Sequence, residues 1–138
     1  MKVVLDTNVF VSGVFFSGPP YQILAAWRAG RVALVVSPEI LDEYARVGRG
    51  LGRQFPRVDL TPFLELLLAS GLVYRPEPLP ESVCQDPDDD KFLACALVAG
   101  CKFVVSGDKH LLHVSGYHGI AVIRPRRFVD AYLETSEP

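Results

Sequence analysis

The sequence predicts an α/β domain in which a mostly parallel sheet is covered by helices on both faces. Short runs of β-branched and apolar residues alternate along the chain with longer segments of helical periodicity. Proline opens several of the helical segments, and glycine follows their ends. Such alternation favours a parallel sheet between two helical layers. We expect one domain, residues 1–138, because domains commonly run to about 100–200 residues.

Four short segments have the composition of buried strands. Residues 2–5 are a β-branched, apolar run that stops at the polar cluster Asp6-Thr7-Asn8. The other strands are predicted at residues 32–36, 103–105 and 120–123. Sites in parallel sheets lie at the carboxyl ends of the strands, so the polar residues that follow these segments are the first candidates for function.

Helices are predicted between these strands. Pro19-Pro20 opens a helix over residues 21–29, and Ser37-Pro38 opens one that continues to Ala45. Further helices are predicted at residues 62–70, 91–99 and 128–133. The glycine-rich residues 48–56 predict a loop or a loosened helix end, and residues 76–87, with four prolines, predict an irregular segment.

Composition excludes several classes of protein. The chain has 14 Lys and Arg against 16 Asp and Glu, a formal net charge of −2, which disfavours a strongly basic nucleic-acid clamp. Its three cysteines contain no C-x-x-C pair and predict reduced thiols rather than disulfides or a zinc site. The N-terminus has too short an apolar run for a signal peptide, and no run approaches the ~20 residues of a membrane span. We therefore expect a cytoplasmic protein.

Four carboxylates from distant segments are predicted to meet at one edge of the sheet. Asp6 and Asp108 each follow a predicted strand, Asp90 opens the helix over residues 91–99, and Glu43 lies one turn into the helix after Ser37-Pro38. Crowded carboxylates repel one another unless a cation neutralises them. Mg²⁺ or Mn²⁺, as one or two ions, suits oxygen ligands of this kind, and its chemistry is water activation and displacement at a phosphate.

Each acid also has a purely structural interpretation. Asp6 could cap a loop and Asp108 could cap a helix. Asp88 and Asp89 are interpreted as a solvated helix start, where acids complement the helix dipole. Glu43 could be an exposed helix residue, as Glu39 and Asp42 are expected to be.

The motifs that contain these acids resemble those of PIN domains. The resemblance rests on LDTNV at residues 5–9, SPEILDEY at 37–44, DPDDDKFLA at 86–94 and VSGD at 105–108, and it spans essentially the whole chain. It is closest to the PIN proteins described as toxin components of toxin–antitoxin systems. The one departure is Gly107, where many relatives have Asn.

The resemblance implies a three-layer α/β/α sandwich and a Mg²⁺- or Mn²⁺-dependent endoribonuclease. Carried over position by position, the catalytic and metal-binding acids are Asp6, Glu43, Asp90 and Asp108, with Asn8 and Ser106 as supporting polar residues. Relatives are often homodimers that an antitoxin protein inhibits, so the resemblance also implies both of these partners.

RNA binding requires positive charge near the acids. Arg46, Arg49 and Arg53 are spaced to share one helix face if the helix passes Gly48, and they are candidate RNA-binding residues. A second cluster consists of Arg124, Arg126 and Arg127. Either cluster could equally be a solvated surface.

Three other functions fit the sequence less well. A PIN fold that only binds or assembles would be expected to lack site acids, and all four are present. A haloacid-dehalogenase-type phosphatase requires a second Asp at position 8, where this chain has Asn8. A receiver-type phosphoacceptor requires a lone Asp after a central strand, and Val36 is followed by Ser37 instead.

Overall fold

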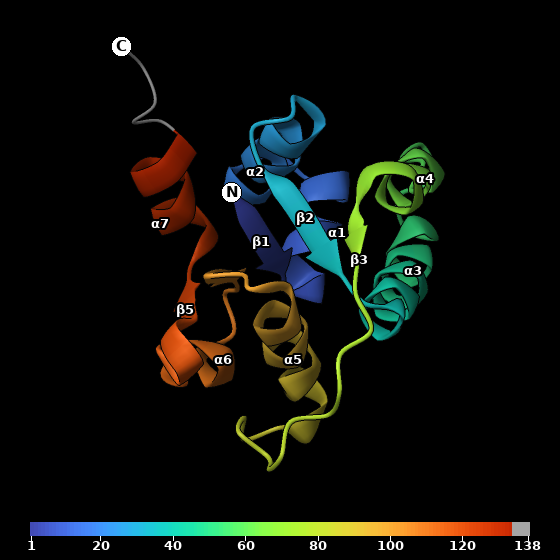
Figure 1. Ribbon diagram of the computed structural model, residues 1–138. Helices are drawn as coiled ribbons and strands as arrows, with labels where there is room; N and C mark the ends of the chain where they lie inside the picture. Colours follow the sequence, from blue (N-terminus) through green and yellow to red (C-terminus); the bar gives the residue numbers. More distant parts are fainter. Residues whose placement is uncertain (134–138) are drawn as a thin grey trace.

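The computed structural model describes residues 1–133 and contains five strands and seven α-helices over that range. Figure 1 shows the chain from its N-terminus, which enters the central strand, to the last helices at one side. The strands are β1 (Lys2–Leu5), β2 (Ala33–Val36), β3 (Leu72–Val73), β4 (Phe103–Val105) and β5 (Ala121–Ile123). The helices are α1 (Thr7–Phe15), α2 (Pro19–Arg28), α3 (Pro38–Gly52), α4 (Thr61–Ser70), α5 (Asp90–Ala99), α6 (Lys109–His113) and α7 (Pro125–Phe128). Shorter helical turns are η1 (Pro87–Asp89), η2 (Tyr117–Gly119) and η3 (Val129–Leu133).

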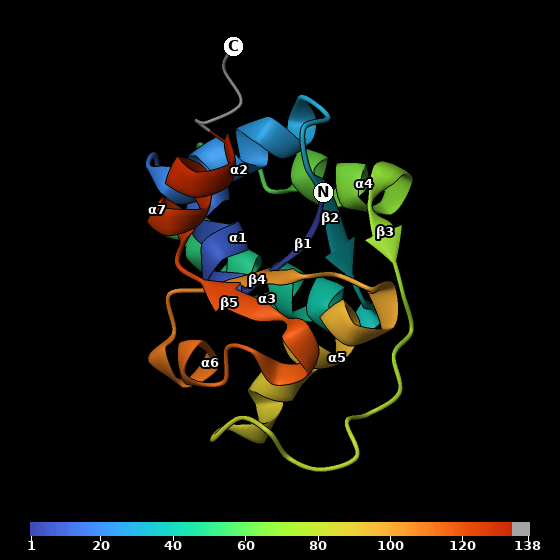
Figure 2. The ribbon, with the colours of Figure 1, turned by 60° about the vertical axis from the view of Figure 1, so that its left-hand side comes forward.

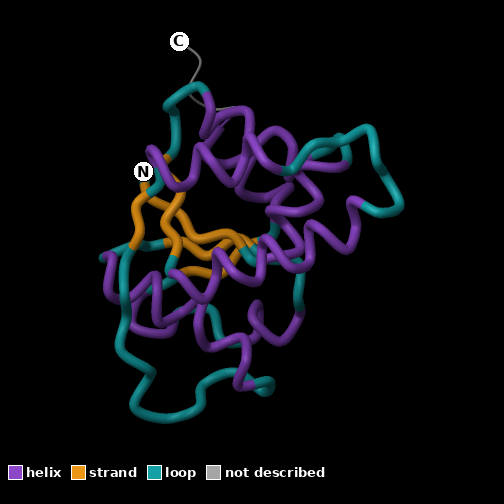
Figure 3. Tube along the Cα trace, turned by 90° about the vertical axis from the view of Figure 1, so that its right-hand side faces the viewer, coloured by secondary structure: helices purple, strands orange, loops and turns teal. Residues whose placement is uncertain are grey.

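The five strands form a sheet of order β3-β2-β1-β4-β5, and all four pairings are parallel. The predicted α/β sandwich with a parallel sheet is thereby confirmed. Figure 2 shows α1, α2 and α7 on one side of the sheet and α5 and α6 on the other. Figure 3 shows the strands lying together between these helical layers, with a long loop leading from β3 to α5.

The central strands are fully buried, because helices cover both faces of the sheet. Val3, Val4, Val104 and Val105 each have 0% of their surface exposed. Burying a valine side chain stabilises a fold by roughly 1.5–3 kcal/mol, so this apolar centre fixes β1 beside β4. The three cysteines, Cys84, Cys95 and Cys101, are free and buried.

Two helical segments differ from the sequence-based prediction. The helix α1 begins directly after Asp6, although its β-branched residues Val9 and Val11 lower helix propensity and gave no helix prediction. Packing against the sheet and α2 outweighs that propensity. The helix α3 continues to Gly52, into the region that was predicted as a loop or a loosened helix end. Two short elements, β3 and α6, were not predicted either.

Gly48 explains why α3 tolerates glycine in its interior. A Cβ atom at this position would lie 2.6 Å from a methyl group of Leu60, whose side chain packs against the helix there. The close approach of Leu60 therefore requires a residue without a side chain. Gly50 lies two residues further along the helix, and a Cβ atom added there would have no other atom within 4 Å.

We expect the two glycines to respond in opposite ways to alanine. Gly50→Ala should raise the free energy of unfolding by about 0.5–1 kcal/mol, because alanine has the higher helix propensity and meets open space. Gly48→Ala should lower it by about 1 kcal/mol, because Leu60 must move. Urea unfolding of both variants measures the difference, and equal gains in both would show that the contact with Leu60 is unimportant.

Candidate active site

The candidate site lies where the chain leaves β1 and β4 at the carboxyl edge of the sheet. The two strands pair in register, with Leu5 opposite Val105. The chain turns from β1 toward β2 on one side, while β4 lies on the other, and a crevice is expected at such a switch point. Asp6 and Ser106, which follow the paired residues, lie next to each other as a result.

Asp6 is held by neighbours rather than by a capping role. Asp6 is the N-cap residue of α1, but its side chain makes no capping hydrogen bond to that helix. The Ser106 hydroxyl donates a hydrogen bond of 2.7 Å to Asp6 Oδ2, and Ser106 is fully buried. Ser106, which was predicted as a supporting polar residue, therefore contacts Asp6 directly. Thr7, the next residue, is buried and its hydroxyl has no hydrogen-bond partner within residues 1–133.

Ser106 also connects Asp6 to Asp108. The backbone N–H of Asp108 donates to Ser106 Oγ at 2.9 Å. One carboxylate oxygen of Asp108, Oδ1, accepts from the backbone N–H of His110 at 2.9 Å and caps the short helix α6. Asp108 thus has the capping role considered from its sequence. Its second carboxylate oxygen makes no hydrogen bond within the described residues, and it is available to a ligand.

The neighbouring residues Asp89 and Asp90 have different surroundings. Asp90 accepts backbone hydrogen bonds with both oxygens, from Cys84 at 2.7 Å and from Val83 at 3.1 Å. It therefore ties the loop before α5 to the start of that helix. Asp89 makes no hydrogen bond with its carboxylate in the described chain, and it interacts electrostatically with Asp108 and Asp6. Asp89 is the third carboxylate of the candidate site.

Sequence reasoning missed Asp89 because three consecutive aspartates open α5. A run of acids at a helix start is commonly a solvated, dipole-stabilised end, and Asp89 does lie at the start of α5, where it is only partly exposed. Its candidacy depends on the amides of Val83 and Cys84, which bind the carboxylate of Asp90 and not that of Asp89. No local pattern in the sequence gives this contact.

Burial and charge repulsion raise the pKa values of Asp6 and Asp89. Burial raises the pKa of Asp6 above its usual value, and the charges of Asp108 and Glu43 raise it further, while the Ser106 hydrogen bond opposes them. Burial, followed by the charges of Asp108 and Asp6, raises the pKa of Asp89 to about 6. Carboxylates that are this difficult to ionise favour a bound cation.

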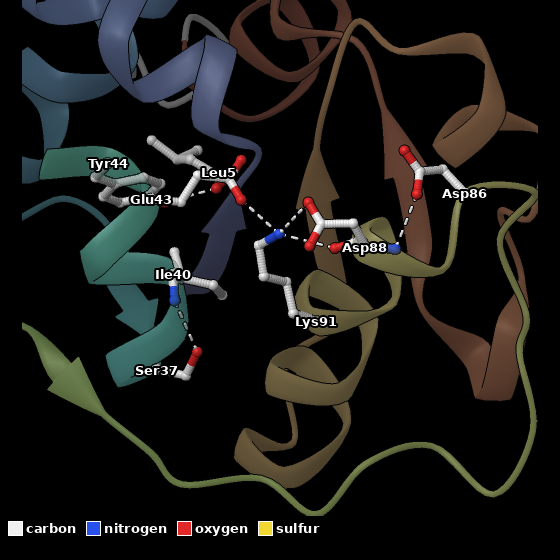
Figure 4. Close-up of polar contacts among 8 residues, drawn as sticks. All are labelled: Leu5, Ser37, Ile40, Glu43, Tyr44, Asp86, Asp88 and Lys91. Atoms are coloured by element: carbon white, nitrogen blue, oxygen red, sulfur yellow. Dashed lines mark hydrogen bonds and ion pairs between the residues drawn. The ribbon is translucent and has the colours of Figure 1, made fainter. Parts of the chain in front are cut away.

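Glu43 reaches the site region but pairs with a lysine. Glu43 Oε1 lies 2.5 Å from the ammonium of Lys91, which also contacts the carboxylate of Asp88 at 3.0 Å. Figure 4 shows Lys91 between Glu43 of α3 and Asp88 before α5. The same view shows the buried Tyr44 hydroxyl donating to the Leu5 carbonyl at 2.5 Å, which fixes α3 at the end of β1.

The carboxylates match a hard divalent cation in chemistry. Asp6, Asp89 and Asp108 offer only oxygen donors, as Mg²⁺ and Mn²⁺ prefer, and no Lys or Arg forms an ion pair with any of the three within residues 1–133. In the described residues, however, no three or more His, Cys, Asp or Glu side chains are placed so that together they could hold a metal ion. The three carboxylates therefore fit such an ion by donor type and charge and not by their present arrangement.

The other predicted site residues make no hydrogen bond or ion pair with these carboxylates within residues 1–133. Asn8 is exposed, and its side chain makes no hydrogen bond within the described chain. Arg46 and Arg49 are exposed on α3, which starts at the carboxyl edge of the sheet and runs away from it, and the exposed Arg53 follows the end of this helix. Arg46 and Arg49 follow Glu43 by about 4.5 and 9 Å along the helix axis. Their role in RNA binding stays a prediction.

The second arginine cluster lies beside the site. The Arg124 guanidinium donates to the Gly107 carbonyl at 3.4 Å, and Gly107 immediately precedes Asp108. An open hollow of about 520 Å³ is lined by Arg124, Arg126, Arg127, Asp130 and Ala131. None of the three arginines forms an ion pair within residues 1–133. This hollow is thus a positively charged surface next to the carboxylates.

Comparison with known proteins agrees with this geometry. The PIN domain family matches residues 2–110, a stretch that runs from β1 past Asp108. The chain therefore belongs to the PIN domain family, whose members are generally nucleases and commonly use divalent metals. Over nearly its full length it is also similar to the uncharacterized protein MJ1680 of Methanocaldococcus jannaschii. The two sequences are 26% identical over an alignment length of 148 residues. The alignment covers 96% of this chain and 92% of that protein.

No single helix within residues 1–133 has the length and apolar composition needed to span a membrane. The helices α1 and α2 meet that criterion only when taken together, with a bend of 86° between them.

We expect Asp89→Asn to stabilise the metal-free protein in a pH-dependent way. The folded-state pKa of about 6 lies above the ordinary aspartate value of 3.8, so ionising Asp89 destabilises the fold as the pH rises through this window. In EDTA, the variant should gain about 1 kcal/mol over wild type at pH 7.5, after allowance for solvent screening. The gain should disappear near pH 4.

Urea unfolding at the two pH values measures this effect. Asp42→Asn, which changes an exposed carboxylate on α3, is the matched control and should show no such gain at pH 7.5. Equal stabilities of the Asp89→Asn variant and wild type at pH 7.5 would contradict the proposed crowding of Asp89.

Proposed function

We propose that this protein is a divalent-metal-dependent endoribonuclease whose carboxylates Asp6, Asp89 and Asp108 hold the ion. The observation that carries the proposal is the group of uncompensated carboxylates at the switch point of a PIN-family sheet. A Mg²⁺ or Mn²⁺ ion bound there would supply an activated water and stabilise charge that develops on a phosphate.

Residues around this group keep it in place. Ser106 orients Asp6 through its hydrogen bond, and it fixes the backbone of Asp108 through a second one. Asp90, predicted from the motif as a ligand, instead anchors the loop at Val83 and Cys84, so Asp89 replaces it in the proposed metal site. These contacts limit the motion of the Asp6 carboxylate and of the Asp108 backbone, and such preorganisation is what a catalytic site requires.

RNA rather than a small phosphate ester suits the shape of the site. The carboxylates lie at the open edge of the sheet, and the arginine-lined hollow beside Asp108 extends the charged surface away from them. A strand with a phosphate at Arg124 would lie close to Asp108, because Arg124 contacts the carbonyl of the preceding Gly107. Single-stranded RNA is the substrate that this arrangement and the motif resemblance favour.

The biological role that fits such a nuclease is that of a toxin. We propose that the chain is the toxin of a toxin–antitoxin pair, acts in the cytoplasm, forms a homodimer and is inhibited by an antitoxin protein. The resemblance of the four sequence motifs to toxin components supports this part of the proposal.

Substitution of the three carboxylates should abolish metal-dependent RNA cleavage. We expect Asp6→Asn, Asp89→Asn and Asp108→Asn each to lower the rate by roughly 100-fold or more, because each removes negative charge that holds the ion. Cleavage of single-stranded RNA with Mn²⁺, Mg²⁺ or EDTA measures the effect. Asp42→Asn should remain active. Full activity of wild type in EDTA would refute the metal mechanism, and inactivity of wild type with every ion would favour a PIN fold that only binds or assembles.

The two arginine clusters should contribute differently to RNA binding. In an Asp89→Asn background, changing Arg124, Arg126 and Arg127 to alanine should weaken binding. It should also reduce the slope of log affinity against log salt by about 2–3. The triple change of Arg46, Arg49 and Arg53 should have the smaller effect, because α3 carries them away from the site. Fluorescence anisotropy at several salt concentrations compares the two, and the opposite ranking would place RNA along α3.

A further inference from the structure

Lys91 is a buried cation inside an otherwise acidic region. It is the second residue of α5, and only 7% of its surface is exposed. Its ammonium contacts Glu43 Oε1 at 2.5 Å, the Asp88 carboxylate at 3.0 Å and the Asp88 backbone carbonyl at 2.8 Å. An ammonium group has three hydrogen-bond donors, so these three oxygens satisfy it completely. Figure 4 shows the ammonium enclosed between the two carboxylates.

The partners of Lys91 come from separate parts of the chain. Glu43 belongs to α3 on one side, whereas Asp88 lies in the η1 turn that leads into α5. Burying an unpaired ammonium is strongly unfavourable, and the two carboxylates compensate for it. The ring of Phe92, with its centroid 5.0 Å from the ammonium, adds a further favourable contact. The position is thus a cation site made of oxygen donors, and a residue of the chain occupies it.

Glu43 differs from the other carboxylates of the region because it forms an ion pair with a lysine. Lys91 forms an ion pair with Glu43, while no Lys or Arg within residues 1–133 forms an ion pair with Asp6, Asp89 or Asp108. The Lys91 charge also lowers the pKa of Asp89, but less than burial and the neighbouring aspartates raise it. One divalent cation compensates most of the charge of these three. A second divalent ion near Glu43 would have to displace Lys91 from a buried, fully hydrogen-bonded position.

We propose that the Lys91 ammonium fills the place of a second divalent cation between α3 and α5, so that the acidic site binds a single divalent ion through Asp6, Asp89 and Asp108. This inference rests on the proposed metal-dependent function and specifies its stoichiometry. Glu43 then acts as a positioning residue for Lys91 and not as a ligand of the ion.

The experiment measures Mn²⁺ binding to the purified full chain without RNA, by isothermal titration calorimetry and by the EPR signal of free Mn²⁺. Wild type should bind one ion. Lys91→Met keeps the length of the side chain, removes its charge and frees the carboxylates of Glu43 and Asp88, so this variant should bind two ions. The control Lys102→Met, at an exposed lysine before β4, should still bind one. Two ions in wild type, or one ion in a folded Lys91→Met protein, would overturn the proposal.

A second pair of variants tests the role of Glu43 without removing Lys91. Asp89→Asn should weaken the binding of the single ion by roughly 100-fold, and Glu43→Gln by less than about threefold. Equal losses would make Glu43 a ligand and would overturn the inference. Lys91→Arg, which retains the charge, should still bind one ion.

Failure of this inference differs from failure of the proposed function. Metal-dependent RNA cleavage together with two bound ions in wild type would contradict only the role of Lys91. RNA cleavage that persists in EDTA, with no Mn²⁺ bound by wild type, would contradict both.

Discussion

The parallel pairing of β1 with β4 is the constraint on which the candidate site depends. It places Leu5 opposite Val105, so that two polar segments 100 residues apart in sequence leave the sheet at the same level. The Asp6 backbone N–H donates to the Val105 carbonyl at 3.0 Å and extends the pairing by one residue into the site. Ser106 then reaches Asp6 with its side chain and Asp108 with the same oxygen. A shift in register by one residue would turn Asp6 toward the opposite face of the sheet.

Carboxylates repel one another at this edge of the sheet, and the apolar core compensates for the loss of stability. Burial makes Asp6 and Asp89 difficult to ionise, which lowers stability at neutral pH when no cation is bound. The apolar strands and the helices that cover them supply the compensating stability. Lys91 removes one source of repulsion by pairing with Glu43, and this ion pair also connects α3 to α5 beside the site. Local instability of this kind is typical of sites that bind charged ligands.

Much of the fold could be predicted from local pattern. Four of the five strands and the helices that Pro19 and Pro38 open were predicted close to their observed positions, because these signals act within a few residues. The helix α1 could not be predicted, since Val9 and Val11 favour strands and only burial against the sheet makes them helical. The sequence left the end of α3 open between a loop and a loosened helix end, and the structure continues the helix to Gly52. The glycine at position 48 accommodates the side chain of Leu60, a contact that local sequence does not show.

By itself, the sequence determined the alternation of strands and helices, the membership of the PIN family, and the supply of acids at strand ends and helix starts. Of the acids predicted for the site, Asp6 and Asp108 lie beside Ser106 as expected. Only the tertiary structure decided that the loop amides of Val83 and Cys84 bind the carboxylate of Asp90 and leave that of Asp89 without a hydrogen bond in the described residues, because this contact joins a loop to the start of a helix. It likewise decided that Glu43 meets Lys91, since that contact requires two helices from different crossovers to converge at the same edge of the sheet.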